Sequence, residues 1–196
     1  MRSILFIYLI SVTASFAQSD KGALPYRELP EPPAHYNSGT VASRLLDGLG
    51  FRFYWATEGL RESDLSFKPG DDTRTSLETI KHIFGMSYII LNVAEKKSTH
   101  FPQPDEKLSF EQIREITLRN IHKASAIIAN ANLDDLTQHP MIFESNSGNA
   151  EYPFWNLVNG PISDCLWHVG QVVTFRRSSG NPFSSKVSVL SGQVRE

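Results

Sequence analysis

Four long stretches of the sequence repeat apolar residues at the spacing of a helix face, and this repetition limits the folds open to the chain. The stretches run from Thr40 to about Arg61, from Thr75 to about Lys96, from Ser109 to about Asn132, and from Pro153 or Phe154 to Ser179. Apolar side chains three or four residues apart are typical of amphipathic α-helices. No strand–helix alternation and no internal repeat accompanies them. We therefore predict an all-α chain, a four-helix bundle with a long crossover between helices three and four.

The crossover, Leu133–Tyr152, and the C-terminal tail have a different composition from the four helices. In the crossover, a polar run at Glu144–Asn149 is flanked by apolar residues, and this pattern fits either a short hairpin or a long loop. The fourth helix is expected to bend at Asn159-Gly160-Pro161, because proline removes a helix hydrogen bond. The tail after Gly180 is irregular, and its Lys186–Leu190 segment is expected to form a strand-like strap over the bundle.

The first 17 residues have the pattern of a secretory signal peptide, with Arg2 at the start, an apolar run at Ile4–Val12 and the cleavage motif Ser15-Phe16-Ala17. The apolar run is too short to span a bilayer as a permanent helix. We expect an exported chain, periplasmic or extracellular, that begins near Gln18 and has no membrane span after cleavage.

These patterns divide the chain into three parts. Residues 1–17 would be the signal peptide, residues 18–38 a proline-rich extended lead-in, and residues 39–196 the bundle with its irregular tail. The composition agrees, since a chain of 196 residues with 40% apolar and 20% charged residues can bury the core of one globular domain. The net charge of −2, without clustered Lys and Arg, argues against a nucleic-acid partner.

Polar residues of the last stretch fall on one side of the predicted helix. Asp164, His168 and Gln171 occupy positions i, i+4 and i+7, so they share a face beside the apolar stripe. His82, in the second stretch, borders the apolar face of its own helix. The remaining histidines are expected to be solvated, and they are His35, His100, His122 and His139. The one cysteine, Cys165, is expected to be a small buried apolar residue and not a nucleophile.

His82, Asp164 and His168 together offer two imidazoles and one carboxylate to a divalent metal ion. Three such ligands leave positions for water or substrate and fit Zn²⁺, Ni²⁺, Mn²⁺ or Fe²⁺ without selecting among them. Gln171 would orient a ligand from behind, because a metal-bound histidine usually donates its other N–H to a partner. The alternative needs no metal, since an Asp and a His one turn apart also form a local ion pair or hydrogen bond.

The motif around these residues resembles that of the DinB-like superfamily of metal-binding four-helix bundles. The family motif has the form His-x-x-x-His-x-x-Gln, and here Asp164-Cys165-Leu166-Trp167-His168-Val169-Gly170-Gln171 takes its place. The resemblance extends from about Thr40 to Gly180. It implies that one histidine of helix two and two residues of helix four hold the ion, and these fall on His82, Asp164 and His168. Asp164 replaces the first histidine of the motif, which makes the set more anionic.

The resemblance implies a divalent-metal-dependent enzyme, of the hydrolase or transferase type, that acts on an unknown small-molecule substrate. The alternative is a non-catalytic ligand-binding or structural bundle with a degenerate metal site. A ligand pocket in that case would be formed by the large aromatic residues, although core packing is the simpler interpretation for them: Phe51, Trp55, Phe154, Trp155 and Trp167. DinB-like bundles often pair, so the resemblance is also consistent with a homodimer.

Overall fold

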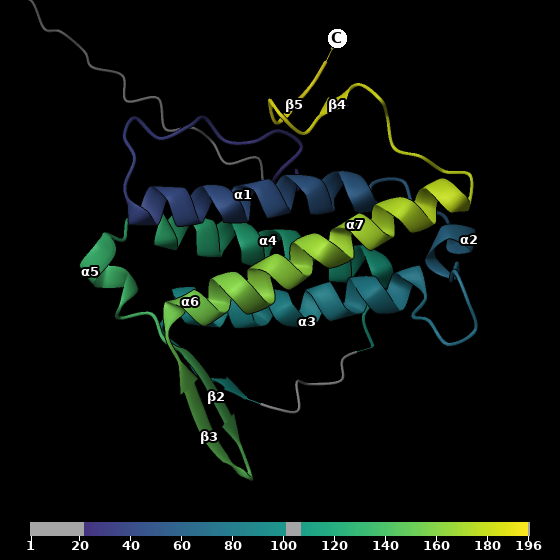
Figure 1. Ribbon diagram of the computed structural model, residues 1–196. Helices are drawn as coiled ribbons and strands as arrows, with labels where there is room; N and C mark the ends of the chain where they lie inside the picture. Colours follow the sequence, from purple (N-terminus) through teal and green to yellow (C-terminus); the bar gives the residue numbers. More distant parts are fainter. Residues whose placement is uncertain (1–21, 101–106, 196) are drawn as a thin grey trace, which may run out of the picture.

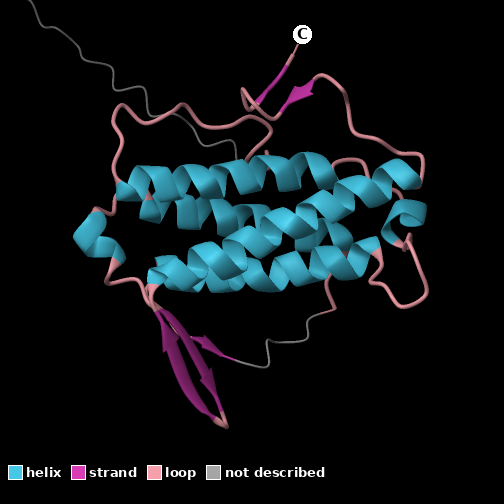
Figure 2. Cartoon of the chain, viewed as in Figure 1, coloured by secondary structure: helices cyan, strands magenta, loops and turns pink. Residues whose placement is uncertain are grey.

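The structure is a computed structural model that describes residues 22–100 and 107–195. This part of the chain is mostly helical, with two small sheets (Figures 1 and 2). Its four long helices are α1 (Ser38–Thr57), α3 (Ser76–Ala94), α4 (Phe110–Ile128) and α7 (Ser163–Ser178). Helices α1 and α3 each pack against both α4 and α7. The prediction of an all-α chain is wrong in part, because strands follow α3 and α7 and also fill the crossover.

Side-chain caps explain where the long helices begin. The Thr75 hydroxyl accepts a hydrogen bond from the backbone N–H of Glu78 at 3.1 Å, and the Glu78 carboxylate accepts one from the backbone N–H of Thr75 at 2.7 Å. Ser109 caps α4 in the same way. These caps, Thr75 and Ser109, are the residues from which the sequence pattern predicts the second and third helices. Helix α1 starts earlier than predicted, because Asn37 accepts from the N–H of Thr40 at 2.8 Å.

Helix α1 also ends earlier than predicted, at Thr57 instead of Arg61. Gly59 adopts a positive φ of 67° just beyond the helix, a conformation that glycine enters without steric cost. The chain then forms the short helix α2 (Glu62–Leu65) before the loop that leads to α3. A second short helix, α5 (Leu133–Leu136), follows α4.

The fourth long helix is continuous but widens before the candidate site. Helix α6 (Phe154–Leu157) passes into a π-helical segment, Val158–Ile162, and that segment passes into α7. Pro161 lies inside the π-helical segment and cannot donate a backbone hydrogen bond, and the Ser163 hydroxyl donates to the Val158 carbonyl at 2.6 Å. The bend expected here is therefore a local widening of the helix. Asp164 lies on the first turn beyond it.

The crossover contains the hairpin that the sequence left as one of two alternatives. Strands β2 (Met141–Ser145) and β3 (Gly148–Tyr152) pair antiparallel around a two-residue turn, and Figure 2 shows them projecting from the helices. The short strand β1 (Thr99–His100) pairs parallel with β2. In the C-terminal tail, β4 (Val187–Ser188) pairs with β5 (Gln193–Val194), so the predicted strap is present as a very short ribbon.

The core lies between the four long helices. Its fully buried side chains come from all four of them and include Leu46, Leu49, Phe53, Ile83, Ile90, Leu118, Ile121, Cys165 and Val172. Burial of one such aliphatic or aromatic side chain stabilises the fold by roughly 1.5–3 kcal/mol. The core thereby fixes α3 against α7, the two helices that carry the candidate metal ligands.

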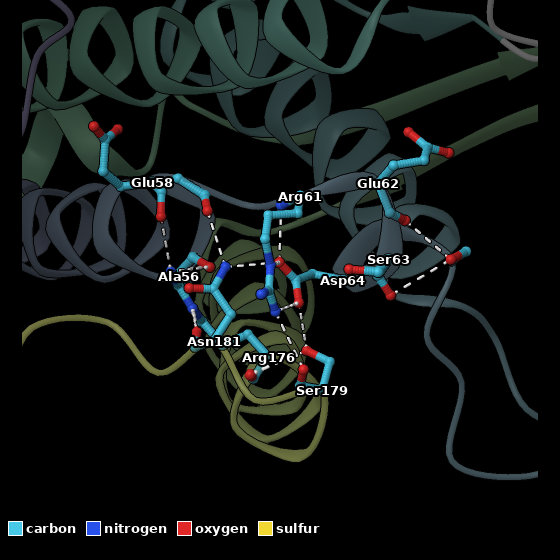
Figure 3. Close-up of polar contacts among 11 residues, drawn as sticks. Ala56, Glu58, Arg61, Glu62, Ser63, Asp64, Arg176, Ser179 and Asn181 are labelled. Atoms are coloured by element: carbon cyan, nitrogen blue, oxygen red, sulfur yellow. Dashed lines mark hydrogen bonds and ion pairs between the residues drawn. The ribbon is translucent and has the colours of Figure 1, made fainter.

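A group of polar residues, with Asp64 and Arg176 buried at its centre, joins one end of the helices. We call it the polar junction, and its members are Arg61, Asp64, Arg176, Ser179 and Asn181. Figure 3 shows Asp64 between Arg61, Ser179 and Asn181. Asp64 is fully buried and accepts hydrogen bonds from all three. Arg176 donates to the carbonyls of Trp55, Ala56 and Glu58, which the end of α1 leaves without helical partners. The junction ties the end of α1 to the end of α7.

The structure tests only part of the predictions about the signal peptide, export and membrane spans. The expected signal peptide, residues 1–17, lies outside the described residues. Among the described helices, none is both long enough and apolar enough to cross a bilayer. Export and the cleavage site therefore stay predictions.

Candidate metal centre

Side chains from α3 and α7 meet at the three positions predicted as metal ligands. Nε2 of His82 lies 3.3 Å from Oδ2 of Asp164, and Nε2 of His168 lies 3.4 Å from Oδ1 of the same carboxylate. One donor atom from each residue can be chosen so that all three lie within 4.8 Å of one another. The structure thus brings together residues that are 82 positions apart in the sequence.

The packing of α3 on α7 produces this arrangement. Asp164 and His168 are one turn apart on α7 and so point to the same side. On α3, the fully buried Ile80 and Ile83 hold the adjoining turn in the core, and His82 lies at the edge of the packed surface. The two imidazole rings meet edge to face, with centroids 4.8 Å apart and planes at 85°. Both rings are therefore positioned by neighbours.

Gln171 determines which ring nitrogen of His168 carries the hydrogen. Its Oε1 lies 2.8 Å from Nδ1 of His168, and because an amide oxygen can only accept, Nδ1 carries the hydrogen. In the neutral ring, Nε2 then has a lone pair and turns it toward the carboxylate of Asp164. A lone pair and an anionic oxygen at this distance repel unless a cation lies between or beside them. A proton or a metal ion meets that requirement.

The donor atoms lie close to the spacing that a metal ion requires. Ligand bonds of about 2.0–2.1 Å in tetrahedral geometry place neighbouring donor atoms roughly 3.3–3.4 Å apart. The observed separations of 3.3 and 3.4 Å run to two different oxygens of Asp164, Oδ2 for His82 and Oδ1 for His168. With one donor atom per residue, all three lie within 4.8 Å of one another, so the side chains would draw together slightly around an ion. Imidazole nitrogen and carboxylate oxygen together suit Zn²⁺, Fe²⁺, Ni²⁺ and Mn²⁺, so the donor set fits a divalent ion without choosing one.

The site is open on one side. The side chains of His82 and Asp164 are 37% and 40% exposed, whereas that of His168 is 14% exposed. Three protein ligands with an accessible side leave room for water or a substrate group, as in catalytic metal sites. A structural metal site would instead be closed by a fourth protein ligand.

Cys165 takes no part in the site, although it lies next to Asp164. Its side chain is fully buried in the core, as predicted. Burial raises the pKa of the thiol, and the negative charge of Asp164 raises it further. The residue is therefore a protonated, inert thiol and neither a ligand nor a nucleophile.

The prediction for the other histidines is wrong at one position. His35, His100 and His122 are exposed, as expected. His139 is only 5% exposed, and its Nδ1 lies 3.0 Å from the carbonyl oxygen of Val93. The segment after α5 folds back on the end of α3, where this imidazole satisfies a backbone carbonyl. Loop composition alone gives no sign of such a contact.

The aromatic residues do not gather in one pocket, and two of them are not in the core. Phe51 is fully buried, but Trp155 and Trp167 are each 73% exposed. Core packing is therefore the wrong interpretation for these two tryptophans. Trp167 lies on the solvent side of α7, next to His168 in the sequence. Phe51 and Trp55 do line a cavity, which is described below.

Comparison with known proteins supports the fold. No protein-family model matches the sequence, and no curated protein matches it. A solved crystal structure, that of the DinB-like protein YjoA from Bacillus subtilis, is similar with a TM-score of 0.52 and 14% sequence identity. The match covers 70% of this chain and 93% of that chain. At this identity the likeness shows a shared fold, and it confirms at that level the DinB-like resemblance inferred from the motif around Asp164 and His168.

Proposed function

We propose that this chain is a DinB-like four-helix-bundle protein that binds one divalent metal ion through His82, Asp164 and His168. We further propose that it is a metal-dependent enzyme, of the hydrolase or transferase type, acting on a small molecule. The observation that carries the proposal is that donor atoms of the three residues lie within 4.8 Å of one another, with His168 already oriented by Gln171. The open side of the site supports catalysis in preference to a structural role.

Each residue of the proposed metal site has a distinct role. When bound, a divalent ion supplies Lewis acidity, which lowers the pKa of a coordinated water or thiol. Asp164 contributes one negative charge, so the site neutralises more of the ion's charge than three histidines would. Gln171 keeps the proton of His168 on Nδ1 and leaves Nε2 free to act as a ligand. The exposed side of His82 and Asp164 gives a substrate its approach.

Hydrolysis is the reaction type that we favour. We propose that the chain is exported and begins near Gln18, because its first 17 residues match a signal peptide. An exported protein does not meet the low-molecular-weight thiols of the cytoplasm, which a thiol-dependent transferase would use. N-terminal sequencing of protein recovered from the producing cells tests this step. A chain that retains Met1 and stays in the cytoplasm would contradict it.

Metal analysis of the purified protein tests the binding proposal. Protein produced in medium supplemented with Zn, Mn, Fe and Ni should contain one metal ion per chain. The His168→Ala variant should lose the metal, because it removes a ligand that Gln171 orients. His35→Ala is the matched control, since His35 is exposed and distant in sequence from the site, and it should keep the metal. A metal-free wild type under all four supplements would refute the proposal.

The catalytic step needs its own measurement. Metal-loaded protein should hydrolyse at least one of a panel of ester, amide and phosphoester substrates, and the His168→Ala variant should not. Turnover that survives this substitution would place the chemistry elsewhere. Metal binding without turnover on any substrate would favour the non-catalytic alternative.

A further inference from the structure

A second hollow lies on a different face of α7 from the candidate metal ligands. It is a cavity of about 730 Å³ between α1, α7 and the C-terminal tail, called here the tail cavity. Figure 1 shows the tail leaving the end of α7 and running back past α1. From α7 the cavity is lined by Leu166, Val169, Gly170, Val173 and Arg177. None of these is a candidate metal ligand, so the tail cavity is a separate site.

The walls of the tail cavity are largely apolar and are held in place. Phe51 of α1 is fully buried and lines the cavity beside Trp55. The indole of Trp55 is fixed by a hydrogen bond from Nε1 to the carbonyl of Arg27 at 3.1 Å. On the tail side, Pro182, Phe183, Val187 and Val189 line the cavity. Phe51 is fully buried beneath this wall and is not part of the main core cluster between the four helices.

The charged side chains that line the tail cavity are all positive. Arg52 and Arg177 line it, and its lining residues include no Asp or Glu. Arg52 donates from Nη1 to the Gly48 carbonyl of its own helix at 3.0 Å, and Arg177 lies 5.9 Å from the ring centre of Phe183. Among the described residues, neither guanidinium forms an ion pair. Two guanidiniums without counter-ions at an apolar hollow attract an anion with an apolar body.

We propose that the tail cavity binds an amphiphilic carboxylate, a molecule with one anionic head and an apolar chain. The carboxylate pairs with Arg52 and Arg177, and the chain lies along Trp55 and Val173. The volume is within the range of roughly 300–1,000 Å³ that small-molecule pockets show. The exposed residues Arg177, Ser184 and Ser185 make the cavity reachable from solvent. The proposal stands independently of the metal site.

Tryptophan fluorescence reports binding directly. The chain has three tryptophans, and a Trp155→Phe/Trp167→Phe protein keeps only Trp55, at the wall of the cavity. Both replaced residues are exposed, so their substitution leaves the core intact. Titration with dodecanoate should change the Trp55 emission saturably. Dodecyltrimethylammonium, which has the same chain and the opposite charge, should leave it unchanged. Equal responses to the two amphiphiles would overturn the proposed charge recognition.

Two variants in this background locate the binding site. Arg52→Gln/Arg177→Gln should weaken dodecanoate binding roughly ten- to hundredfold, because the charged hydrogen bonds are lost. Arg119→Gln on α4, which removes an exposed arginine paired with Glu115, is the charge control and should bind normally. Unchanged binding after loss of both cavity arginines would overturn the proposal.

Filling the cavity provides the second test. A Cβ added at Gly170 meets no atom within 4 Å, so Gly170→Met projects into open space and should fold. It should abolish dodecanoate binding by occupying the cavity. Gly85→Met on α3 has the same free space around its Cβ, lies outside the cavity, and should bind normally. Failure of the starting protein to bind dodecanoate, or full binding by Gly170→Met, would refute the assignment.

Discussion

Gln171 and Asp164 contact opposite nitrogens of the His168 imidazole. Oε1 of Gln171 lies 2.8 Å from Nδ1, and Oδ1 of Asp164 lies 3.4 Å from Nε2. The hydrogen bond fixes both the tautomer and the direction of the ring before any ion arrives. Less conformational freedom is then lost on binding, because one ligand already has its bound orientation. Such outer contacts commonly account for a measurable share of metal affinity.

The Gln171→Leu variant should therefore bind Zn²⁺ about 10- to 100-fold more weakly than the wild type. Its three ligands are intact, so one ion should still bind at saturation. Gln171→Glu keeps an oxygen acceptor for the Nδ1 hydrogen and should retain most of the affinity. Competition with a chromophoric chelator measures both. Equal affinities for the wild type and the leucine variant would show that Gln171 does not orient the ligand.

Asp164 offers a test of the charge of the site. The Asp164→His variant restores the three-histidine pattern of the DinB-like motif and should still bind Zn²⁺, whereas Asp164→Ala should lose the ion. Because nitrogen ligands suit Zn²⁺ and oxygen ligands suit Mn²⁺, the histidine variant should shift preference toward Zn²⁺. Competition between the two ions, read by mass spectrometry, measures this shift. An unchanged ratio would mean that Asp164 is not a ligand.

The sequence predicted those features of the fold that local chemistry decides. Caps at Thr75 and Ser109 mark two helix starts, and Pro161 marks the altered turn before α7. Features set by distant contacts could not be predicted. The parallel pairing of Thr99 with Phe143 joins segments 44 positions apart (143 − 99), and no local sequence pattern predicts this pairing. The early end of α1 follows from the positive φ of Gly59, which helix periodicity does not reveal.

The candidate site divides in the same way. Helix periodicity places Asp164, His168 and Gln171 on one face, so their proximity is a local property of α7. The third member, His82, lies on a different helix, and its apolar neighbours single it out among the other histidines, but only the packing of α3 on α7 brings it to Asp164. Sequence spacing does not predict the burial of His139, because this burial depends on a loop that folds back onto α3. Tertiary contacts of this kind leave no signature in spacing.

Asp64 of the polar junction should contribute strongly to stability. Its buried carboxylate accepts hydrogen bonds from Arg61, Ser179 and Asn181, and Asp64→Asn would turn a donor toward these donors. We expect a loss of about 2 kcal/mol in the free energy of unfolding, measured by urea denaturation. Glu115→Gln, which removes an exposed ion pair with Arg119, is the control and should cost less than about 1 kcal/mol. Equal effects would contradict the role of burial.

The same carboxylate should make the stability of the protein depend on pH. Hydrogen bonds from Arg61 above all hold the pKa of Asp64 far below its ordinary value. The stabilisation is therefore complete above pH ~4, where the unfolded chain is also ionised, and is lost as the pH falls further. The stability difference between wild type and Asp64→Asn should narrow as the pH drops below ~4. A difference that stays constant down to pH ~2 would contradict the assignment.

The part of the proline-rich lead-in that the structure describes ahead of α1, residues 22–37, docks on α1 through Tyr26. This residue is 4% exposed, and its hydroxyl donates to Oδ1 of Asp47 at 3.0 Å, an oxygen that also accepts from Ser125 at 2.6 Å. The ring lies directly on Gly50, where a Cβ would meet Cδ2 of Tyr26 at 2.3 Å. Glycine at this position of α1 therefore permits the ring to approach the helix backbone.

The Gly50→Ala variant should force the Tyr26 ring away from α1 and destabilise the protein by about 1–3 kcal/mol, although alanine favours helices. Limited proteolysis should cut the lead-in faster than in the wild type, because the anchor of residues 22–37 is lost. Gly170→Ala is the matched control on α7, where an added Cβ meets nothing within 4 Å, and it should leave the lead-in protected and stability unchanged or raised by up to ~1 kcal/mol. Wild-type protection in Gly50→Ala would show that the contact does not hold the lead-in.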